Sequence, residues 1–244
     1  MCGRYSLTRR QQEISERFGL EQLLEEFKPR FNISPTQNVP VIVKNEEEQK
    51  ILTPYRWGLI PGWVKDLKTA RQIINSRSET LIEKPFFKRL VLKKRCLIPA
   101  DGFYEWKKGA NPKQKIPMWI HLVDKSLFAF AGIYDEWKSE EKTFRSYSII
   151  TTAANDVISP VHDRMPVILP RELEDKWLDA DLKDPDEIMK MLQPYPNELI
   201  TMYQVSSDVN SAKTDQPHMT DQVEEGSELE DQGRTDSTQL KLEL

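Results

Sequence analysis

The sequence predicts an α+β protein with a mostly antiparallel sheet. Short apolar segments of strand character recur along the chain, and helical segments interrupt them without the regular alternation of parallel βαβ units. The 244 residues include 38% hydrophobic and 30% charged residues, a composition typical of globular proteins. Neither a repeat nor a linker divides the chain, so we expect one domain over residues 1–223 and an acidic, disordered tail over 224–244.

The first elements are expected to be a strand over residues 3–8 and a short helix. Thr8 to Gln11 matches a capping box, Ile14 and Phe18 share one helical face, and Gly19 is suited to end the helix. Apolar residues then recur at a spacing that predicts further helix: Leu20, Leu23, Leu24 and Phe27.

Strands dominate the rest of the chain. Runs rich in β-branched and aromatic residues predict strands over residues 38–43, 50–60, 95–99, 102–107, 116–123, 127–133, 146–152 and 199–205. Between them, residues 76–94 are expected to be largely helical, with Pro85 interrupting the helix. Pro170 is suited to begin a helix that runs to about Ala180, and Asp184 to cap another that begins at Pro185.

Charge and composition exclude several classes of protein. The net charge of −4 comes from the tail, which carries −5, so any affinity for nucleic acid requires a local patch on a nearly neutral body. No apolar stretch approaches the ~20 residues of a membrane span and no signal peptide is present, so we expect a cytoplasmic protein without membrane contact. The two cysteines, Cys2 and Cys96, build no disulfide framework, and we expect no metal and no cofactor.

Cys2 is the most distinctive residue because only Met1 precedes it. Initiator methionine is usually removed before a small residue, and its removal here would leave a 1,2-aminothiol. An aldehyde forms an imine with such an amine, and the thiol then closes a thiazolidine ring. Free α-amino groups titrate near pH ~7.7–8.0 and thiols near ~8.5, so we expect both nucleophiles to be populated at neutral pH. The alternative is that Cys2 is simply a buried small residue.

Other polar and aromatic residues stand in short motifs, and each has a structural alternative. Trp57 and Trp63 flank a glycine-proline turn, although tryptophans are core residues more often than base-stacking ones. Asn75 can cap the following helix. Glu105 can lie on the solvent face of its strand, between two inward aromatic residues. His162 lies in a loop, where most histidines are merely exposed.

Taken together, the motifs are specific. MCGRY, WGLIPGW, NSRSET, RCLIPADGFYEW and HDRMP occur in this order from Cys2 to about residue 220. This pattern resembles the SOS response-associated peptidase (SRAP) family of abasic-site processing proteins. The resemblance implies a single SRAP-like domain with a mostly antiparallel, barrel-like core flanked by helices. It also implies that the protein binds single-stranded DNA and crosslinks covalently to abasic sites.

The resemblance assigns roles to nine residues. The catalytic positions are the nucleophile Cys2, Asn75 beside the N-terminal amine, Glu105 and His162. The DNA contacts are Arg4, Arg77 and Arg164 at phosphates, and Pro35 and Trp63 at bases. Val64 stands where some members have a second tryptophan, which leaves the extent of stacking open.

The implied chemistry is thiazolidine formation with the ring-opened sugar of an abasic site. A carboxyl held among aromatic residues has a raised pKa, so Glu105 is suited to protonate the ring oxygen, and His162 to move protons. An imine that persists would give a secondary lyase activity, and Met1 removal a self-cleaving peptidase activity.

Two other functions remain open on the sequence alone. One is a cysteine peptidase or amidohydrolase with an N-terminal nucleophile. The other is a non-catalytic single-strand DNA binder that uses Trp57, Trp63 and the basic run from Lys84 to Arg95. For the crosslinking protein we expect a monomer that associates with the nucleoid when bound to DNA, and a replication-fork protein as a reasonable partner.

Overall fold

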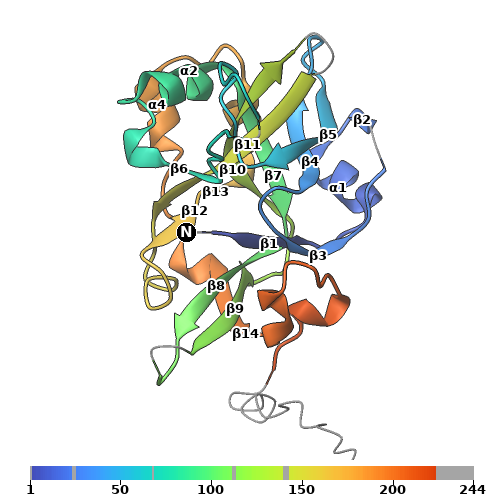
Figure 1. Ribbon diagram of the computed structural model, residues 1–244, viewed down its shortest axis with the longest axis vertical. Helices are drawn as coiled ribbons and strands as arrows, with labels where there is room; N and C mark the ends of the chain where they lie inside the picture. The colour runs from blue at the N-terminus through green and yellow to red at the C-terminus, as the bar shows by residue number, and fades with distance from the viewer. Residues whose placement is uncertain (1, 24–25, 68, 112–113, 140–142, 224–244) are drawn as a thin grey trace, which may run out of the picture.

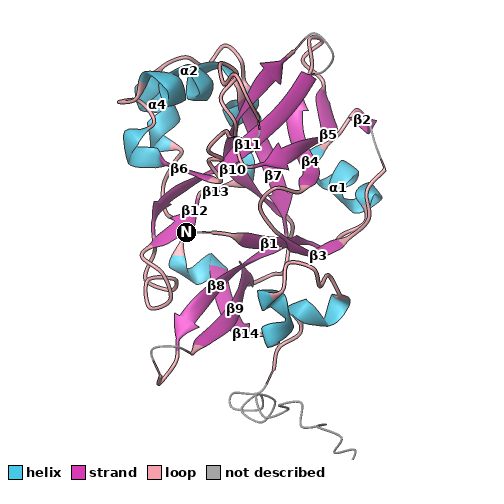
Figure 2. Cartoon of the chain, viewed as in Figure 1, coloured by secondary structure: helices cyan, strands magenta, loops and turns pink. Residues whose placement is uncertain are grey.

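The computed structural model describes residues 2–23, 26–67, 69–111, 114–139 and 143–223. Strands form most of this part of the chain, and short helices lie around them (Figure 2). The predicted α+β class is therefore confirmed. The predicted acidic tail over residues 224–244 lies outside the described residues.

Five strands close into a barrel in the upper half of Figure 1. They are β4 (Asn38–Lys44), β5 (Lys50–Trp57), β7 (Arg95–Ala100), β10 (Phe128–Lys138) and β11 (Thr143–Ala153). Neighbours are antiparallel except β5 and β11, whose parallel pairing sets Tyr147 opposite Trp57 and closes the barrel. Tyr5, which precedes the barrel in sequence, packs its ring edge against Trp57 at 5.2 Å between centroids.

A second sheet of five antiparallel strands lies below the barrel in Figure 1. Its order is β14 (Ile200–Gln204), β9 (Lys115–Leu122), β8 (Gly102–Lys108), β1 (Arg4–Leu7) and β3 (Arg30–Ile33). Only Asp101 separates β7 from β8, so one nearly continuous run of chain passes from the barrel into this sheet. Gly102 is required at the crossing, because a Cβ there would lie 2.2 Å from Trp119 Nε1.

Short strands extend the barrel sheet at its edges. β6 (Asn75–Arg77) runs parallel to β11, with Arg77 opposite Thr151, and β12 (Arg164–Pro166) runs antiparallel to it, with Arg164 opposite Ala153. Two further short strands are β2 (Gln22–Leu23) beside β5 and β13 (Ile168–Leu169) beside β10. β11 thus pairs with both β6 and β12, which are far apart in sequence.

The helices cover the strands and are short. The α-helices are α1 (Gln11–Phe18), α2 (Pro85–Lys93), α3 (Arg171–Leu178) and α4 (Pro185–Lys190). The 3-10 helices are η1 (Ser78–Thr80), η2 (Asn197–Leu199), η3 (Ser207–Asn210) and η4 (Pro217–Thr220). α1 ends at Gly19 with φ 61°, and α4 begins with the Asp184 side chain accepting from Asp186 N, as the sequence predicts. None of the helices in the described segments is long and apolar enough to cross a membrane.

Two predictions near the N-terminus, the capping box at Thr8 and the helix after Gly19, were wrong because these residues bond to distant parts of the chain. The Thr8 hydroxyl donates to Asp101 Oδ2 at 2.5 Å and so does not cap the helix. The capping box forms two residues later in the chain, between Arg10 and Glu13. The segment expected to be helical after Gly19 instead contains strand β2, and Leu24 lies outside the described residues.

The predicted helix over residues 76–94 was wrong in its first half. Ser76 and Arg77 belong to β6, and Asn75 lies in the same strand rather than capping a helix. Pro85 does not interrupt a helix but begins α2, where its missing N–H costs no hydrogen bond. Pro170 is likewise the cap of α3, which begins one residue later.

Candidate functional site

Strand β1 carries Cys2 to the junction between the barrel and the second sheet, where Figure 1 marks the N-terminus beside β12. Asp101, at the crossing from β7 to β8, fixes this strand: its carboxylate accepts from Ser6 Oγ at 2.6 Å and from Thr8 N at 2.6 Å. Arg4 lies opposite Tyr104 in the β1–β8 ladder. The same register, continued by one pair, sets Gly3 level with Glu105.

Cys2 is fully buried at this junction. Its backbone carbonyl accepts a hydrogen bond from Asn75 Nδ2 at 2.8 Å, and its Sγ lies 3.7 Å from the carbonyl oxygen of Arg4. Burial, reinforced by the negative charge of Glu105, raises the pKa of the Cys2 thiol far above its ordinary value. Burial thus favours the protonated thiol over the thiolate that the sequence led us to expect.

Glu105 lies in β8 with 4% of its surface exposed, so the solvent-face alternative is wrong. Burial raises its pKa to about 7, and the negative charge of Asp163 acts in the same direction. A carboxyl with this pKa is part acid and part base at neutral pH. It meets the requirement of a group that both donates and accepts protons.

His162 lies in the loop between β11 and β12. Its Nδ1 accepts a hydrogen bond from the backbone N–H of Arg164 at 2.9 Å. Asp163 Oδ1 also lies 2.9 Å from Nδ1, so a carboxylate and a backbone N–H meet at the same ring nitrogen. Burial lowers the pKa of His162, which favours the neutral ring. Asp163 acts on the pKa of Glu105 as well, which places this loop close to β8.

The three arginines expected at phosphates differ in their surroundings. Arg77 is exposed, and within the described segments its side chain has no hydrogen-bond or ion-pair partner. Arg164 forms a two-pronged ion pair with Glu79. Arg4 donates to Asn32 Oδ1 at 2.7 Å and to the carbonyl oxygen of Val209 at 2.5 Å. Arg77 alone offers a guanidinium that is not already bound inside the protein.

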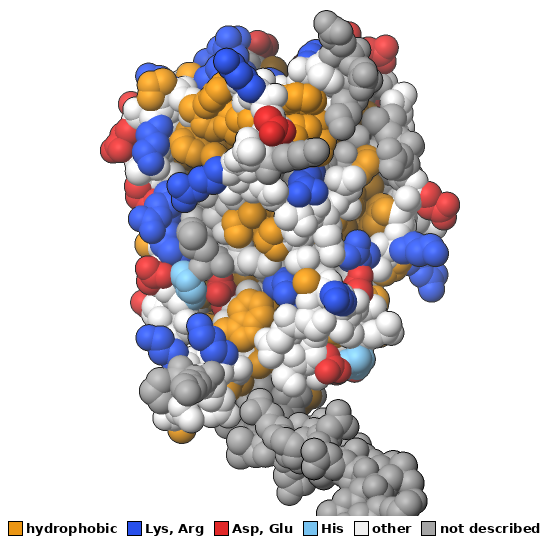
Figure 3. All heavy atoms as spheres, viewed as in Figure 1, with side chains coloured by type: hydrophobic (Ala, Val, Ile, Leu, Met, Phe, Trp, Pro, Cys, Tyr) orange, Lys and Arg blue, Asp and Glu red, His pale blue; other side chains and the backbone are white. Residues whose placement is uncertain are grey.

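The two tryptophans of the WGLIPGW motif have opposite environments. Trp57 is fully buried and donates to the carbonyl oxygen of Ile74, so it is a core residue. Trp63 is 63% exposed, and its ring makes a T-shaped contact with Phe86 at 4.5 Å between centroids. Gly62 N donates to the buried carboxylate of Asp135 at 3.0 Å, which fixes the turn. Figure 3 shows one face of the molecule, on which Lys and Arg side chains lie among apolar ones.

Pro35 is half-buried in a turn beside the same motif. The next residue, Thr36, has φ 77°, and its N–H donates to the carbonyl oxygen of Trp57 at 2.8 Å. Pro35 and Trp63 thus lie in two turns, one bonded to the backbone of Trp57 and the other to the carboxylate of Asp135. This arrangement fits a surface that contacts bases, which the sequence resemblance assigns to these two residues.

A C-terminal strap, residues 205–221, supports the site and was not foreseen from the sequence. Asn32 Nδ2 donates to the carbonyl oxygens of Ser211 and Thr214, and the carboxylate of Asp215 accepts from Phe31 N at 2.6 Å. Through Asn32 and Val209 the strap also holds Arg4. The strap contains no apolar run or motif, so its only sequence signal was the absence of tail-like composition.

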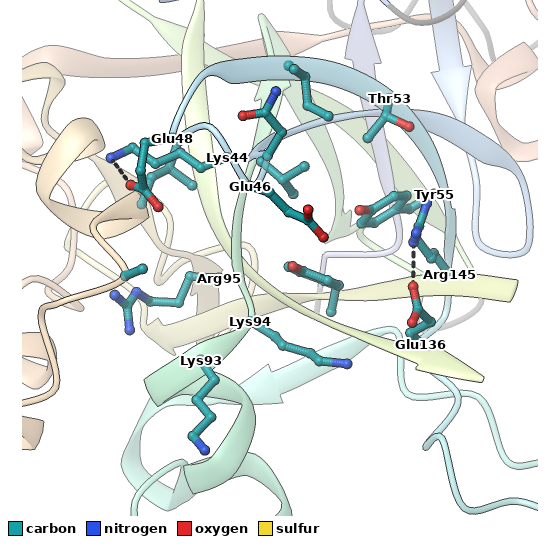
Figure 4. A pocket seen from close by; sticks show the side chains of 16 residues that line it. Lys44, Glu46, Glu48, Thr53, Tyr55, Lys93, Lys94, Arg95, Glu136 and Arg145 are labelled. Atoms are coloured by element: carbon teal, nitrogen blue, oxygen red, sulfur yellow. Dashed lines mark hydrogen bonds and ion pairs between the residues drawn. The ribbon is translucent and has the colours of Figure 1, made fainter. Parts of the chain in front are cut away.

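A cavity of about 510 Å³ lies elsewhere, between the β4–β5 turn, the end of α2 and the strands β10 and β11 (Figure 4). None of the four predicted catalytic residues lines it. Two ion pairs lie among its charged groups, Lys44 with Glu48 and Arg145 with Glu136. The described residues also contain no group of three His, Cys, Asp or Glu side chains that could hold a metal ion.

Comparison with known proteins identifies relatives over nearly the whole described chain. Residues 1–212 match the family model described as SOS response associated peptidase (SRAP). The abasic site processing protein YoqW of Bacillus subtilis is 46% identical over 222 residues, which cover 90% of this chain and 98% of YoqW. The abasic site processing protein HMCES of Pongo abelii is 32% identical, over 89% of this chain and 75% of HMCES.

Solved structures show the same fold. A crystal structure of a protein from Bacteroides thetaiotaomicron superimposes with a TM-score of 0.78 at 27% identity, covering 91% of this chain and 100% of the other. A protein from Bordetella bronchiseptica gives a TM-score of 0.71 at 24% identity, over 84% of this chain. The barrel with its attached sheet is therefore an architecture found in other proteins.

Proposed function

Because the chain belongs to the SOS response associated peptidase (SRAP) family, we propose that it processes abasic sites in single-stranded DNA by bonding covalently to the lesion through Cys2. The observation that carries the proposal is the burial of Cys2 within the electrostatic reach of Glu105, a buried carboxyl whose pKa is raised to about 7. The names of the relatives supply abasic-site processing, and the residues at the junction supply a chemical route.

The first step is the opening of the abasic sugar. The lesion exists mostly as a closed hemiacetal, in which the C1′ hydroxyl must lose a proton and the ring oxygen must gain one. Protonated Glu105 donates to the ring oxygen, the C1′–O4′ bond breaks, the C1′ hydroxyl gives its proton to solvent water, and C1′ becomes an aldehyde carbon. A group with a pKa near the working pH is suited to this transfer, since both of its forms are populated.

The second step bonds the protein to C1′. After removal of Met1, the Cys2 amine adds to the aldehyde and one water leaves, which gives an imine. The Cys2 sulfur then bonds to C1′, and its proton moves to the nitrogen, which closes a thiazolidine. Since the sulfur is protonated at neutral pH, the amine acts first and the thiol needs a base at the moment of attack. Glu105, now a carboxylate, and neutral His162 are the two groups available for that proton.

Binding of the strand uses the exposed groups around this junction. Arg77 contacts a phosphate, and Trp63 and Pro35 contact bases flanking the lesion. Phosphate contacts make the affinity depend on salt, and stacking tolerates any base, so we expect little sequence preference. An abasic nucleotide has no base to unstack, which removes one cost of bringing its sugar to Cys2.

A lyase side reaction and self-removal of Met1 are part of the same proposal, since the first follows from an imine that stays open. A general peptidase is less well supported, because the buried, protonated thiol of Cys2 is not poised to attack a peptide. A purely non-covalent DNA binder was expected to stack bases on Trp57 and Trp63, but Trp57 is buried and reaches no base.

Intact mass spectrometry tests the proposal directly. The purified protein is weighed alone and after incubation with a single-stranded oligonucleotide that carries one abasic site. The expected masses are the chain without Met1, and then a species heavier by the oligonucleotide less one water. An intact-base oligonucleotide is the control and should add no mass. Protein that lacks Met1 and binds the abasic strand without adding mass would overturn the proposal.

A further inference from the structure

The cavity of about 510 Å³ lies at the end of the barrel that faces away from Cys2. All five barrel strands contribute to its wall, through Val43 of β4, Tyr55 of β5, Arg95 of β7, Tyr134 of β10 and Arg145 of β11. Strand β7 begins at this end and leaves the barrel at the other, where Asp101 leads into β8. The cavity and the Cys2 junction are thus at opposite ends of one barrel.

The cavity opens into the interior of the barrel. Side chains alternate along a strand, so Thr53 and Tyr55 point to the same side of β5 as Trp57. Trp57 is fully buried inside the barrel, where its ring stacks on that of Tyr147. The mouths of barrels are common sites for small ligands, and such sites have volumes of ~300–1,000 Å³. The position and the size of the cavity therefore suit a small molecule.

Two neighbouring phenols in the wall have no hydrogen-bond partner for their hydroxyls within the described segments. They belong to Tyr55 and Tyr134, whose ring centroids lie 5.2 Å apart. Tyr55 is only 5% exposed, and Figure 4 shows its hydroxyl directed toward the middle of the cavity. Burial raises the pKa of both phenols, so both stay neutral and can donate. A buried hydroxyl without a partner is unfavourable, and a ligand that accepts a hydrogen bond would satisfy it.

Positive charge exceeds negative charge around these hydroxyls. Five lysines and arginines line the cavity against three glutamates, of which two already form ion pairs. Lys94 shares the buried carboxylate of Asp135 with Arg89, so this group of three carries one positive charge in excess. The Lys94 ammonium lies 5.9 Å from the centroid of the Tyr134 ring, close to the phenols. The cavity is therefore suited to an anion.

Apolar side chains also line the wall, among them Val43, Ile51 and Leu178. An inorganic ion would leave this surface in contact with water, so the ligand should carry an organic part as well. A phosphate monoester combines such a part with an anionic group whose three terminal oxygens accept hydrogen bonds. We propose that this end of the barrel binds a phosphate monoester of the size of a nucleoside monophosphate, with its phosphate at Tyr55, Tyr134 and Lys94.

Calorimetric titration of the full chain with deoxyadenosine monophosphate tests the proposal. The wild type should give a saturable heat of binding. Tyr55→Phe and Tyr134→Phe should each raise the Kd by about 3- to 10-fold, the effect of losing one hydrogen bond. Tyr195→Phe removes a phenol hydroxyl outside the cavity and should leave the Kd unchanged. Deoxyadenosine lacks the charged group and should bind at least about 10-fold more weakly than the monophosphate.

The phosphate monoester can be a free nucleotide or the end of a DNA strand, and competition distinguishes these sources. Short oligonucleotides of one sequence, with and without a 5′-phosphate, are added to the complex with deoxyadenosine monophosphate. Displacement by the 5′-phosphorylated strand alone assigns the cavity to strand ends, and displacement by neither strand assigns it to free nucleotides. Equal displacement by both strands would mean that the nucleotide binds the DNA surface, which overturns the proposal.

Arg77→Ala provides a second check on the location of the site. The Kd for deoxyadenosine monophosphate should be unchanged in this variant, because Arg77 does not line the cavity. Loss of binding in Arg77→Ala, the same Kd in the wild type and both Phe variants, or no saturable heat at all would each overturn the proposal. None of these measurements uses an abasic site, so they stand apart from the success or failure of the crosslinking reaction.

Discussion

Asn75 Nδ2 donates a hydrogen bond of 2.8 Å to the backbone carbonyl oxygen of Cys2, so the strand inserted beside β11 fixes the residue that begins the site. The bond holds the main chain of Cys2 and leaves its amine and sulfur unused. The amide therefore orients the nucleophile without adding charge.

Asn75→Ala should slow crosslinking about 5-fold, which corresponds to one hydrogen bond of about 1 kcal/mol. Single-turnover rates on an abasic oligonucleotide measure the effect. Asn45→Ala removes an amide bond to Gln49 at 2.9 Å in the distant β4–β5 turn and serves as the control. Equal losses in the two variants would mean that Asn75 acts only on stability.

Cys2→Ala should abolish the thiazolidine while leaving an amine that still forms an imine. The adduct should then survive a denaturing gel only after borohydride reduction, whereas the wild-type adduct survives without it. Cys96→Ala is the matched control, because Cys96 is equally buried in β7 and takes no part in the proposed chemistry. Loss of the unreduced adduct in Cys96→Ala as well would point to a general effect of core truncation.

Glu105→Gln should separate activity from stability. Without a proton donor for ring opening, the crosslinking rate should fall by about 10²- to 10⁴-fold. The folded pKa of Glu105 lies above its unfolded value, so the wild type loses stability as pH rises from about 4.5 to 7, by roughly 3 kcal/mol in all. Glu105→Gln lacks this loss, so its Tm should exceed that of the wild type at pH 8 and match it near pH 4. A lower Tm at pH 8 would contradict the buried-carboxyl assignment.

The pH profile of the wild-type reaction should reflect the same group. The protonated fraction of Glu105 falls as pH rises through about 7, so the rate of ring opening should decline above that pH. A pre-opened aldehyde analogue of the abasic sugar should not show this decline, since it needs no ring opening. If the rate declined equally with both substrates, the decline above pH 7 would come from a step other than ring opening.

Arg77→Ala and Arg4→Ala should have opposite signatures. Arg77→Ala should reduce the slope of log affinity against log salt by about 0.7, the value for one phosphate on a single strand, with Tm unchanged. Arg4→Ala leaves Asn32 Oδ1 and the Val209 carbonyl without their donor, so unfolding should become easier by about 1–3 kcal/mol. Salt titrations of binding and thermal melts measure both, and a salt effect in Arg4→Ala alone would exchange the two roles.

Trp63→Ala should weaken binding of single-stranded DNA by about 1–3 kcal/mol, the worth of one base stacked on an aromatic ring. The Tm should not change, because the side chain is 63% exposed. Leu199→Ala, which truncates an exposed apolar residue on another surface, is the control for fluorescence-anisotropy titrations. Equal affinities of Trp63→Ala and the wild type would remove Trp63 from the DNA surface.

The local sequence pattern predicts most strands, but it does not predict which distant residues contact one another at the site. Runs rich in β-branched and aromatic residues suffice to predict β4 or β9, because such side chains favour the extended backbone of a strand. The strand at Asn75–Arg77 has no such pattern, since its conformation comes from pairing with β11 some 75 residues later. The pairing of Glu79 with Arg164 and the capture of Arg4 by the strap are equally non-local. Resemblance to a family supplied the residues, and only the fold supplies their contacts.

The hydrogen bond from Arg4 to Val209 joins residues 205 positions apart, and Cys2, two residues before Arg4, is fully buried in the folded chain. A ribosome adding about 5–20 residues per second needs roughly 10–40 seconds to make the intervening chain. During this interval Cys2 has left the ribosome while the strap that secures β1 has not been made. Removal of Met1 by an aminopeptidase would therefore have to act on the nascent chain, whereas self-removal would wait for the folded site.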